Sequence, residues 1–254
     1  MTFQFPFLTK DKTTKKLRSL STKVKLGAVI LPLLVLFGVV SCKKPNIESI
    51  KDFRNRLYTP TFIQKIDNLY FIVDCWHHRI IYSDTVERPI GSWNTLDENI
   101  GGPHSVASKG DYLITENTGY NSIKVFKRDR KAGEYYFHQE IFDTGSRPHR
   151  IEYCPETEMF YVISSGSPYL YCFKIDKVSD KVILHLVKNL DFLTNAYTRS
   201  FRIIDDKMYF VSGNNKIVVT TYQDEQFTVI AEYPVPNELA SMNDIYIKRM
   251  IGSL

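Results

Sequence analysis

Cysteine is scarce in this 254-residue chain, which contains four, at positions 42, 75, 154 and 172. Cys42 adjoins an N-terminal hydrophobic run, and the three cysteines beyond it are an odd number, which excludes a complete disulfide framework. Cys172 lies in an apolar run, so we expect buried free thiols. A bond between Cys154 and Cys172, which fall within one repeat, is the alternative.

Several motifs of common enzymes are also missing. The chain has no Gly-x-Ser-x-Gly nucleophile elbow, no Gly-rich phosphate loop and no Cys-x-x-Cys pair. No long stretch follows the 3.6-residue period of a helix. The sequence therefore indicates no nucleophilic, nucleotide-binding or dithiol chemistry through these motifs.

An excess of positive charge is lacking once the N-terminal segment is set aside. Residues 1–41 hold seven of the 33 basic residues and one of the 28 acidic residues, which leaves 26 basic against 27 acidic. Recognition of nucleic acid needs a clustered basic face. Nucleic acid is therefore excluded as an expected partner.

Long hydrophobic runs are limited to one, residues 26–40, which is 15 residues long. A spanning helix needs about 20. Basic residues precede the run and Ser41 and Cys42 follow it, which is the pattern of a secretory signal. The stretch Val39-Val40-Ser41-Cys42 also resembles the bacterial lipobox, which implies lipidation of Cys42. An uncleaved membrane anchor is the alternative, and both place the rest in the cell envelope, facing the periplasm or the exterior.

The remaining chain is rich in short Tyr, Phe, Ile and Val runs separated by turns, and it repeats itself. Pro103-His104 and Pro148-His149 open two similar segments 45 residues apart. Further copies start at residues 60 and 200, and a fifth start appears at Met242. Repeats of about 40–50 residues made of short strands are typical of β-propeller blades. We therefore predict an all-β fold with four full blades of four strands and the first strand of a fifth.

The predicted organisation has three parts. Residues 1–41 form the signal or anchor, 42–58 the lipidated cysteine and tether, and 59–254 an incomplete propeller. Because radial repeats protect sheet edges by closing the ring, we expect a truncated descendant of a six-bladed protein. The alternative is an intact small propeller in which residues 47–55 complete the last blade.

The repeats resemble known propeller families. Residues 69–74 followed by His78-Arg79-Ile80 look like an NHL repeat, and Gly102-Pro103-His104 with Thr115-Glu116 is similar to the repeat of streptogramin lyases. The resemblance covers residues 59–222. It implies the architecture, and it implies that Asp74 and Glu116 join neighbouring blades. The paired His and Glu that the lyases carry on one late blade are not found. His104, Glu116 and His149 match only the residue types of the metal-binding and catalytic residues in those enzymes.

Alignment of the blades brings candidate site residues to equivalent positions. One register holds Thr61, His104, His149, Phe201 and Asn243. Two imidazoles with an amide are compatible with a divalent metal, Zn or Ca, at His104, His149 and Asn243. The alternative is that both histidines only cap strands through backbone carbonyls.

The adjacent register holds Arg150 and Arg202, which either receive a carboxylate or phosphate or form salt bridges with acidic neighbours such as Asp244. Any catalysis would fall to His104, His149, Arg150 and Arg202. The loop residues Trp76-His77-His78 are a candidate for ligand stacking, against the alternative that the indole packs on the blade edge.

No complete catalytic set emerges from these positions. We therefore expect a membrane-tethered propeller that binds a protein, peptide or glycan. The alternatives are a metal-dependent lyase or lactonase-like hydrolase acting in the axial funnel, and an inactive remnant of such an enzyme.

Overall fold

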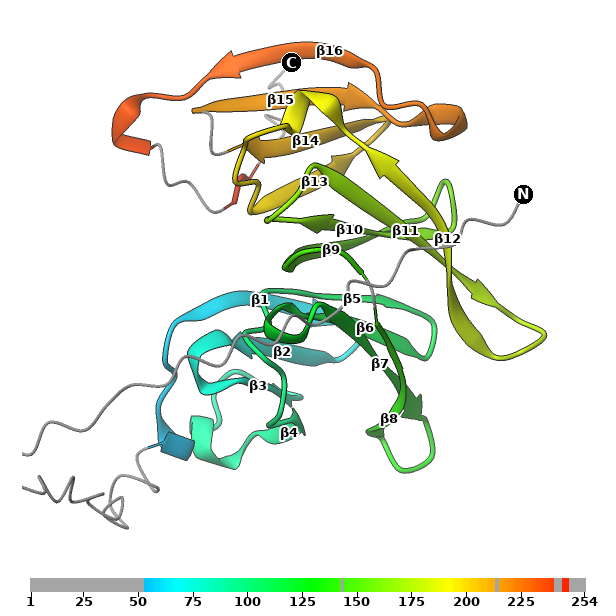
Figure 1. Ribbon diagram of the computed structural model, residues 1–254. Coiled ribbons are helices and arrows are strands. Elements are labelled where there is room, and N and C mark those ends of the chain that lie inside the picture. The colour runs from blue at the N-terminus through cyan, green and yellow to red at the C-terminus, as the bar shows by residue number, and fades with distance from the viewer. Residues whose placement is uncertain (1–52, 143, 213–214, 240–243, 247–254) are drawn as a thin grey trace, which may run out of the picture. The chain divides into compact units, whose positions relative to one another are not determined.

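The computed structural model describes residues 53–142, 144–212, 215–239 and 244–246, which belong to one compact unit, Pro45–Leu254 (Figure 1). Cys42, Asn243 and Met242 lie outside the described residues. Of the segment 47–55, residues 53–55 are described and are helical. The helices in the described part of the chain are short, and none could cross a bilayer.

The described strands form four four-stranded antiparallel sheets, which we call blades 1 to 4 (Figure 1). Blade 1 consists of β1 (Pro60–Ile66), β2 (Leu69–Asp74), β3 (Arg79–Ser83) and β4 (Asn94–Asp97). Blade 2 consists of β5 (Val106–Lys109), β6 (Tyr112–Asn117), β7 (Ser122–Asp129) and β8 (Glu134–Ile141). Blade 3 consists of β9 (Pro148–Cys154), β10 (Met159–Ser164), β11 (Tyr169–Asp176) and β12 (Lys181–Asn189). Blade 4 consists of β13 (Ser200–Ile204), β14 (Lys207–Ser212), β15 (Lys216–Thr221) and β16 (Val229–Pro234).

Each blade is a meander in which consecutive strands pair, and this confirms the predicted propeller architecture of four blades. The first strands of successive blades contact one another, β1 with β5, β5 with β9 and β9 with β13. The segments that open these strands therefore converge. The predicted repeat starts at 60, 148 and 200 coincide with strand starts, whereas Pro103-His104 lies just before β5.

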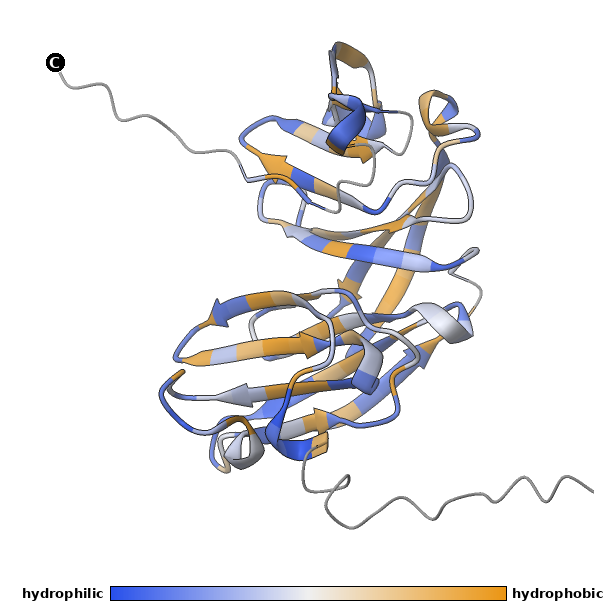
Figure 2. Ribbon diagram, turned by 90° about the vertical axis from the view of Figure 1, so that its left-hand side faces the viewer, coloured by the Kyte–Doolittle hydropathy of each residue, from blue (hydrophilic) through white to orange (hydrophobic). Residues whose placement is uncertain are grey.

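The hydrophobic core lies between blades, because strand residues alternate between the two faces of a sheet. In β10, Phe160 and Val162 pack against blade 2, while Tyr161 and Ile163 pack against blade 4. A third cluster joins blades 1 and 2 around Phe71. Hydrophobic and hydrophilic residues accordingly follow one another in bands along the strands (Figure 2).

Tight turns connect the strands, and one of them depends on glycine. Gly110 joins β5 to β6 with φ of +60°, a conformation that costs a residue with a Cβ roughly 1 kcal/mol. A Cβ at Gly110 would meet no atom, so conformation rather than space selects glycine there.

The three described cysteines, Cys75, Cys154 and Cys172, are free and buried. This confirms the expectation of buried thiols and excludes the alternative bond between Cys154 and Cys172.

Candidate functional site

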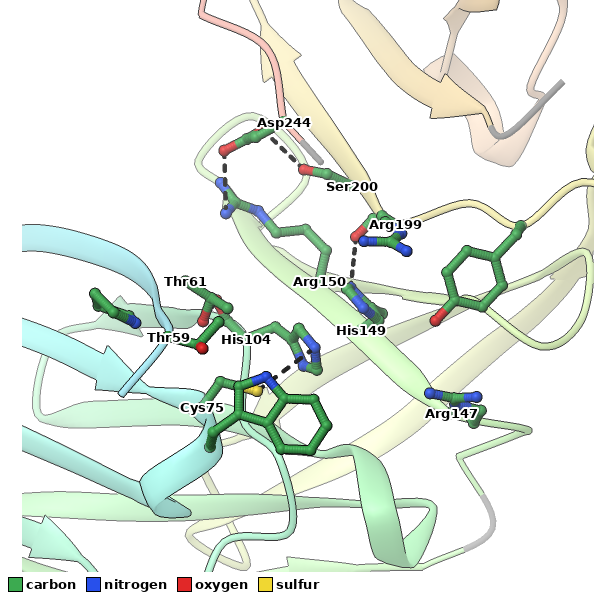
Figure 3. Close-up of a pocket in the computed structure, with 13 residues that line it drawn as sticks. Thr59, Thr61, Cys75, His104, Arg147, His149, Arg150, Arg199, Ser200 and Asp244 are labelled. Carbon is green, nitrogen blue, oxygen red and sulfur yellow. Dashed lines mark hydrogen bonds and ion pairs between the residues drawn. The ribbon is translucent and has the colours of Figure 1, made fainter. Parts of the chain in front are cut away.

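A cavity of about 420 Å³, the central pocket, lies where the opening segments of the blades converge (Figure 3). All four blades contribute to it through equivalent places in the chain. The contributing residues are Thr61 of β1, His104 before β5, His149 of β9 and Ser200 of β13. Phe201, which the alignment placed level with the histidines, is instead fully buried between blades 3 and 4.

His104 and His149 are brought into direct contact, as their shared register predicted. Their ring centroids are 3.7 Å apart with an angle of 36° between the planes, and Figure 3 shows the imidazoles next to each other. His149 is buried, and His104 is half-buried. The propeller repeat therefore does place two imidazoles side by side in the central pocket.

Hydrogen bonds fix the tautomer of both rings. His149 Nδ1 lies 2.8 Å from the backbone oxygen of Arg199, to which it can only donate. The Thr118 hydroxyl donates to the backbone oxygen of Pro148, so it accepts from His104 Nδ1 at 3.3 Å. Both Nε2 atoms therefore keep a lone pair, and His104 Nε2 lies 3.8 Å from the Cys75 thiol.

Both imidazoles are neutral at neutral pH. Burial, and next the neighbouring His149, lower the pKa of His104 to about 3. Burial lowers the pKa of His149 to about 4. The hydrogen bond to the Arg199 backbone oxygen opposes this shift, and the charges of Arg199 and Arg147 add to it. The histidines are therefore hydrogen-bonding groups rather than cations.

The positive charge of the pocket comes from arginines. Arg147, Arg150 and Arg199 line it, against one carboxylate, Asp244. The guanidinium groups of Arg147 and Arg199 lie 5.8 and 5.1 Å from the ring centre of Tyr197, on which both pack. Among the described residues of the lining, arginines therefore outnumber carboxylates.

Arg147 is held by an unusual backbone. It directly precedes Pro148 at the start of β9 and has φ of +59°. Thr59 and Gly102, which precede Pro60 and Pro103 in blades 1 and 2, share this left-handed conformation with φ of +60° and +63°. Only glycine adopts it without strain, and strained residues cluster at functional sites.

Arg150 and Arg202 belong to a network of ion pairs. Arg150 is buried and lies 2.8 Å from Glu152 and 3.6 Å from Asp244. Arg202 lies 2.9 Å from Glu152 and 2.6 Å from Asp244. The structure thus brings the two predicted arginines together in salt bridges, as one of the two predictions for this register had it, and Arg150 also lines the pocket.

The structure describes two of the three predicted metal ligands. His104 and His149 adjoin, and Asn243 lies outside the described residues. Among the residues that the structure describes, no group of three or more His, Cys, Asp and Glu side chains could hold a metal ion. The described donors therefore do not form a site for Zn or Ca, and the assignment stays a prediction.

The two carboxylates predicted to join blades differ in their contacts. Asp74 accepts hydrogen bonds from the Tyr58 amide at 2.6 Å and Arg79 Nε at 2.9 Å, and it pairs with His77, all in blade 1 or the segment before it. Glu116 accepts a hydrogen bond from the Ser105 hydroxyl at 2.7 Å, and that hydroxyl accepts the Ile151 amide of blade 3.

Glu116 thus connects to the next blade through one side chain. It is fully buried, and burial raises the pKa of its carboxyl to about 8.

The Trp76-His77-His78 loop contributes to the site in part. Trp76 is 60% exposed and lines the central pocket. His77 contacts the Phe53 ring and Asp74, and His78 Nδ1 accepts the Gly102 amide at 3.1 Å. The indole is therefore available for stacking, whereas the two imidazoles serve the local structure.

Sequence reasoning missed Arg147, Arg199 and Tyr197. A signal was present, because Arg147 and Arg199 each stand directly before the first residue of a blade's first strand. The blade starts predicted from the repeat lie one residue later, at Pro148 and Ser200.

Known proteins resemble this chain in fold. No family model and no curated protein matches the sequence. Among solved structures, a candidate 6-phosphogluconolactonase from Bacteroides uniformis ATCC 8492 has a TM-score of 0.58 and 13% identity over 72% of this chain and 59% of that one. Its counterpart from Bacteroides fragilis NCTC 9343 has a TM-score of 0.57 and 13% identity over 70% and 57%.

The periplasmic gluconolactonase of Pseudomonas aeruginosa is similar too, with a TM-score of 0.53 and 13% identity over 69% of this chain and 54% of that one. The chain thus spans a little over half the length of these structures. At such identities the likeness concerns the β-propeller fold, and the resemblance to NHL and streptogramin-lyase repeats stays a prediction.

Proposed function

We propose that this propeller binds a small anionic ligand, through a carboxylate or phosphate group, in the central pocket. One observation carries the proposal, namely that the guanidinium groups of Arg147 and Arg199 pack on Tyr197 at a cavity whose two histidines are neutral. The volume of about 420 Å³ suits a small molecule. The propeller fold hosts many functions, and ligand binding is compatible with it.

The arrangement of donors and acceptors narrows the chemistry of the ligand. A guanidinium group recognises carboxylate or phosphate with two parallel hydrogen bonds, and packing on Tyr197 holds Arg147 and Arg199 in place. His149 Nε2 can accept a hydrogen bond from a ligand, whereas His104 Nε2 lies against the Cys75 thiol, so a hydroxyl group next to the anion is favoured. We infer a hydroxy acid or a sugar phosphate.

Substitution of Arg147 by glutamine tests this proposal. Calorimetric titration of the full-length protein in detergent with D-gluconate or inorganic phosphate should give saturable, salt-dependent binding. Arg147→Gln should weaken it by about 10- to 100-fold, because a hydrogen bond to a charged group contributes roughly 1.5–3 kcal/mol. Arg88→Gln, which removes an exposed ion pair with Asp84 and does not alter the lining of the central pocket, is the control. Equal affinities in Arg147→Gln and the control would contradict the proposal.

A lactonase-like hydrolase is the second candidate, favoured by the names of the similar structures and by the imidazole lone pairs. Water would lose a proton to a histidine Nε2 while its oxygen attacks the lactone carbonyl, and the imidazolium would then return this proton to the ring oxygen as the ring C–O bond breaks. Because the pKa of His149 is lowered to about 4, the base would stay competent from neutral pH down to about 5.

Hydrolysis of D-glucono-1,5-lactone, followed by acid release, separates the two functions. His149→Gln should abolish catalysed hydrolysis while gluconate still binds. A rate equal to the uncatalysed background in the unaltered protein would leave ligand binding as the function.

We further propose that lipidated Cys42 tethers the propeller to the outside of a bacterial membrane. The basic residues, the hydrophobic run and the lipobox-like sequence before Cys42 support this. In Cys42→Ala, mass spectrometry should find an uncut, lipid-free precursor. A cut and lipid-bearing Cys42→Ala product would refute the proposal.

A further inference from the structure

A second cavity, the aromatic cleft, adjoins the central pocket. It has a volume of about 680 Å³ and shares Cys75, Trp76, His104 and Arg147 with the central pocket. Its further lining includes Tyr120 and a strip of glycine backbone at Gly101 and Gly119. A ligand in one cavity can therefore extend into the other past the same arginine.

Two aromatic side chains line the cleft with most of their surface in solvent. Trp76 is 60% exposed and Tyr120 is 67% exposed. Each belongs to the 3-10 turn that follows the second strand of its blade, Cys75–His77 in blade 1 and Thr118–Tyr120 in blade 2. Exposed aromatic rings that share a cavity are the usual means of stacking a ligand.

The Tyr120 ring lies directly against Gly101, which has no side chain to displace it. A Cβ on Gly101 would lie 2.8 Å from two carbons of the ring, so the ring rests on bare backbone. The Gly119 amide donates to the Gly101 oxygen at 2.7 Å, and the Gly101 amide donates to Asn117 Oδ1 at 2.6 Å. The Tyr120 ring and the Gly101–Gly119 backbone beneath it, which we call the platform, are therefore in place before any ligand arrives. This lowers the entropic cost of binding.

The polar groups around the platform suit a sugar ring. Asn121 and Ser146 bring an amide and a hydroxyl to the cleft, and Arg147 brings charged donors. A pyranose offers an apolar C–H face to aromatic rings and hydroxyl groups to such polar partners. A flat base would use the rings but little of this mixed set of donors and acceptors.

We propose that the aromatic cleft binds the neutral ring of an acidic saccharide whose carboxylate lies in the central pocket. This rests on the proposed anion site, and it adds a substrate class with two rings, one charged and one neutral. The shared Arg147 marks the junction between the two parts.

Three sugars separate the contributions of charge and ring. Glucuronate carries the charge alone, cellobiose carries two neutral rings, and cellobiouronate joins glucuronate to glucose. Fluorescence of the full-length protein in detergent reports binding, because Trp76 is exposed whereas Trp93, the other tryptophan, is 7% exposed. Cellobiouronate should bind about tenfold more tightly than glucuronate, the gain expected of one stacked ring.

Variants of the platform should remove this gain alone. Tyr120→Ala, and Gly101→Ala, which displaces the same ring, should bind cellobiouronate no more tightly than glucuronate, with the affinity for glucuronate unchanged. Tyr136→Ala is the control, because that ring is 50% exposed on β8 and does not line the cleft.

The outcomes distinguish the two proposals. Equal affinity of the unaltered protein for glucuronate and cellobiouronate overturns the cleft and leaves the anion site standing. If glucuronate fails to bind, the anion site fails, and the acidic saccharide fails with it even where cellobiose binds in a Tyr120-dependent way. A Tyr120-dependent gain for adenosine monophosphate over phosphate, without one for cellobiouronate, would replace the sugar by a base.

Discussion

Glu116 and the histidine pair respond to pH in opposite directions. A histidine whose pKa is lowered by folding favours the unfolded state as pH falls through 6.5 towards about 4. A carboxyl group whose pKa is raised by folding favours the unfolded state as pH rises from 4.5 towards about 8. The free energy of unfolding should therefore peak in mildly acidic solution.

Glu116→Gln should make the protein more stable in alkaline solution. Glutamine resembles the protonated carboxyl group, so the variant escapes the cost of ionising a fully buried Glu116 above pH 4.5. The urea midpoint of the variant relative to the parent should rise from pH 5 to pH 9. Glu87→Gln, at an exposed position, should show no such trend. A constant difference between pH 5 and pH 9 would show that Glu116 ionises normally.

At the scale of strands and turns, the hairpin between β5 and β6 depends on one conformation. Gly110 has φ of +60° and lies between the last residue of β5, Lys109, and the start of β6. Alanine there meets no steric contact, so any loss of stability measures backbone strain alone.

Gly110→Ala should lower the free energy of unfolding by about 1 kcal/mol, and Gly110→Asn by less, because asparagine tolerates the left-handed region. Urea denaturation of the two variants checks this order. Equal stability of Gly110→Ala and the parent would mean that the turn changes its conformation.

The positions of strands and turns can be predicted well from the sequence, and the geometry of the pocket less well, for physical reasons. Strands and turns follow local patterns, so the blade starts at 60, 148 and 200 could be placed within a residue. The contact between His104 and His149 followed from the repeat. The tautomers depend on Thr118 and on the backbone of Arg199, which are distant in sequence, and the burial of Phe201 depends on packing between blades.

For the whole molecule, the closed interior should protect all three described thiols. Burial raises the pKa of Cys75 to about 11 and that of Cys172 to about 12, so thiolate is scarce as well as inaccessible.

With Cys42 replaced by alanine, a thiol reagent at pH 8 should label no cysteine in the native protein and all three in guanidinium chloride. Mass spectrometry counts the labels. Rapid labelling of Cys75, which lines both cavities, would indicate that the pocket opens in solution.

The hydrophobic clusters between blades have a consequence for cooperativity. Each of the three clusters that join blades contains residues of two neighbouring blades. The hydrophobic core of each blade is therefore completed by side chains of an adjacent blade. Such nearest-neighbour coupling transmits a local defect along the array rather than confining it. Truncation of Phe160 should thus speed hydrogen exchange in β6 of blade 2 as well as in β10, at both walls of a single interface.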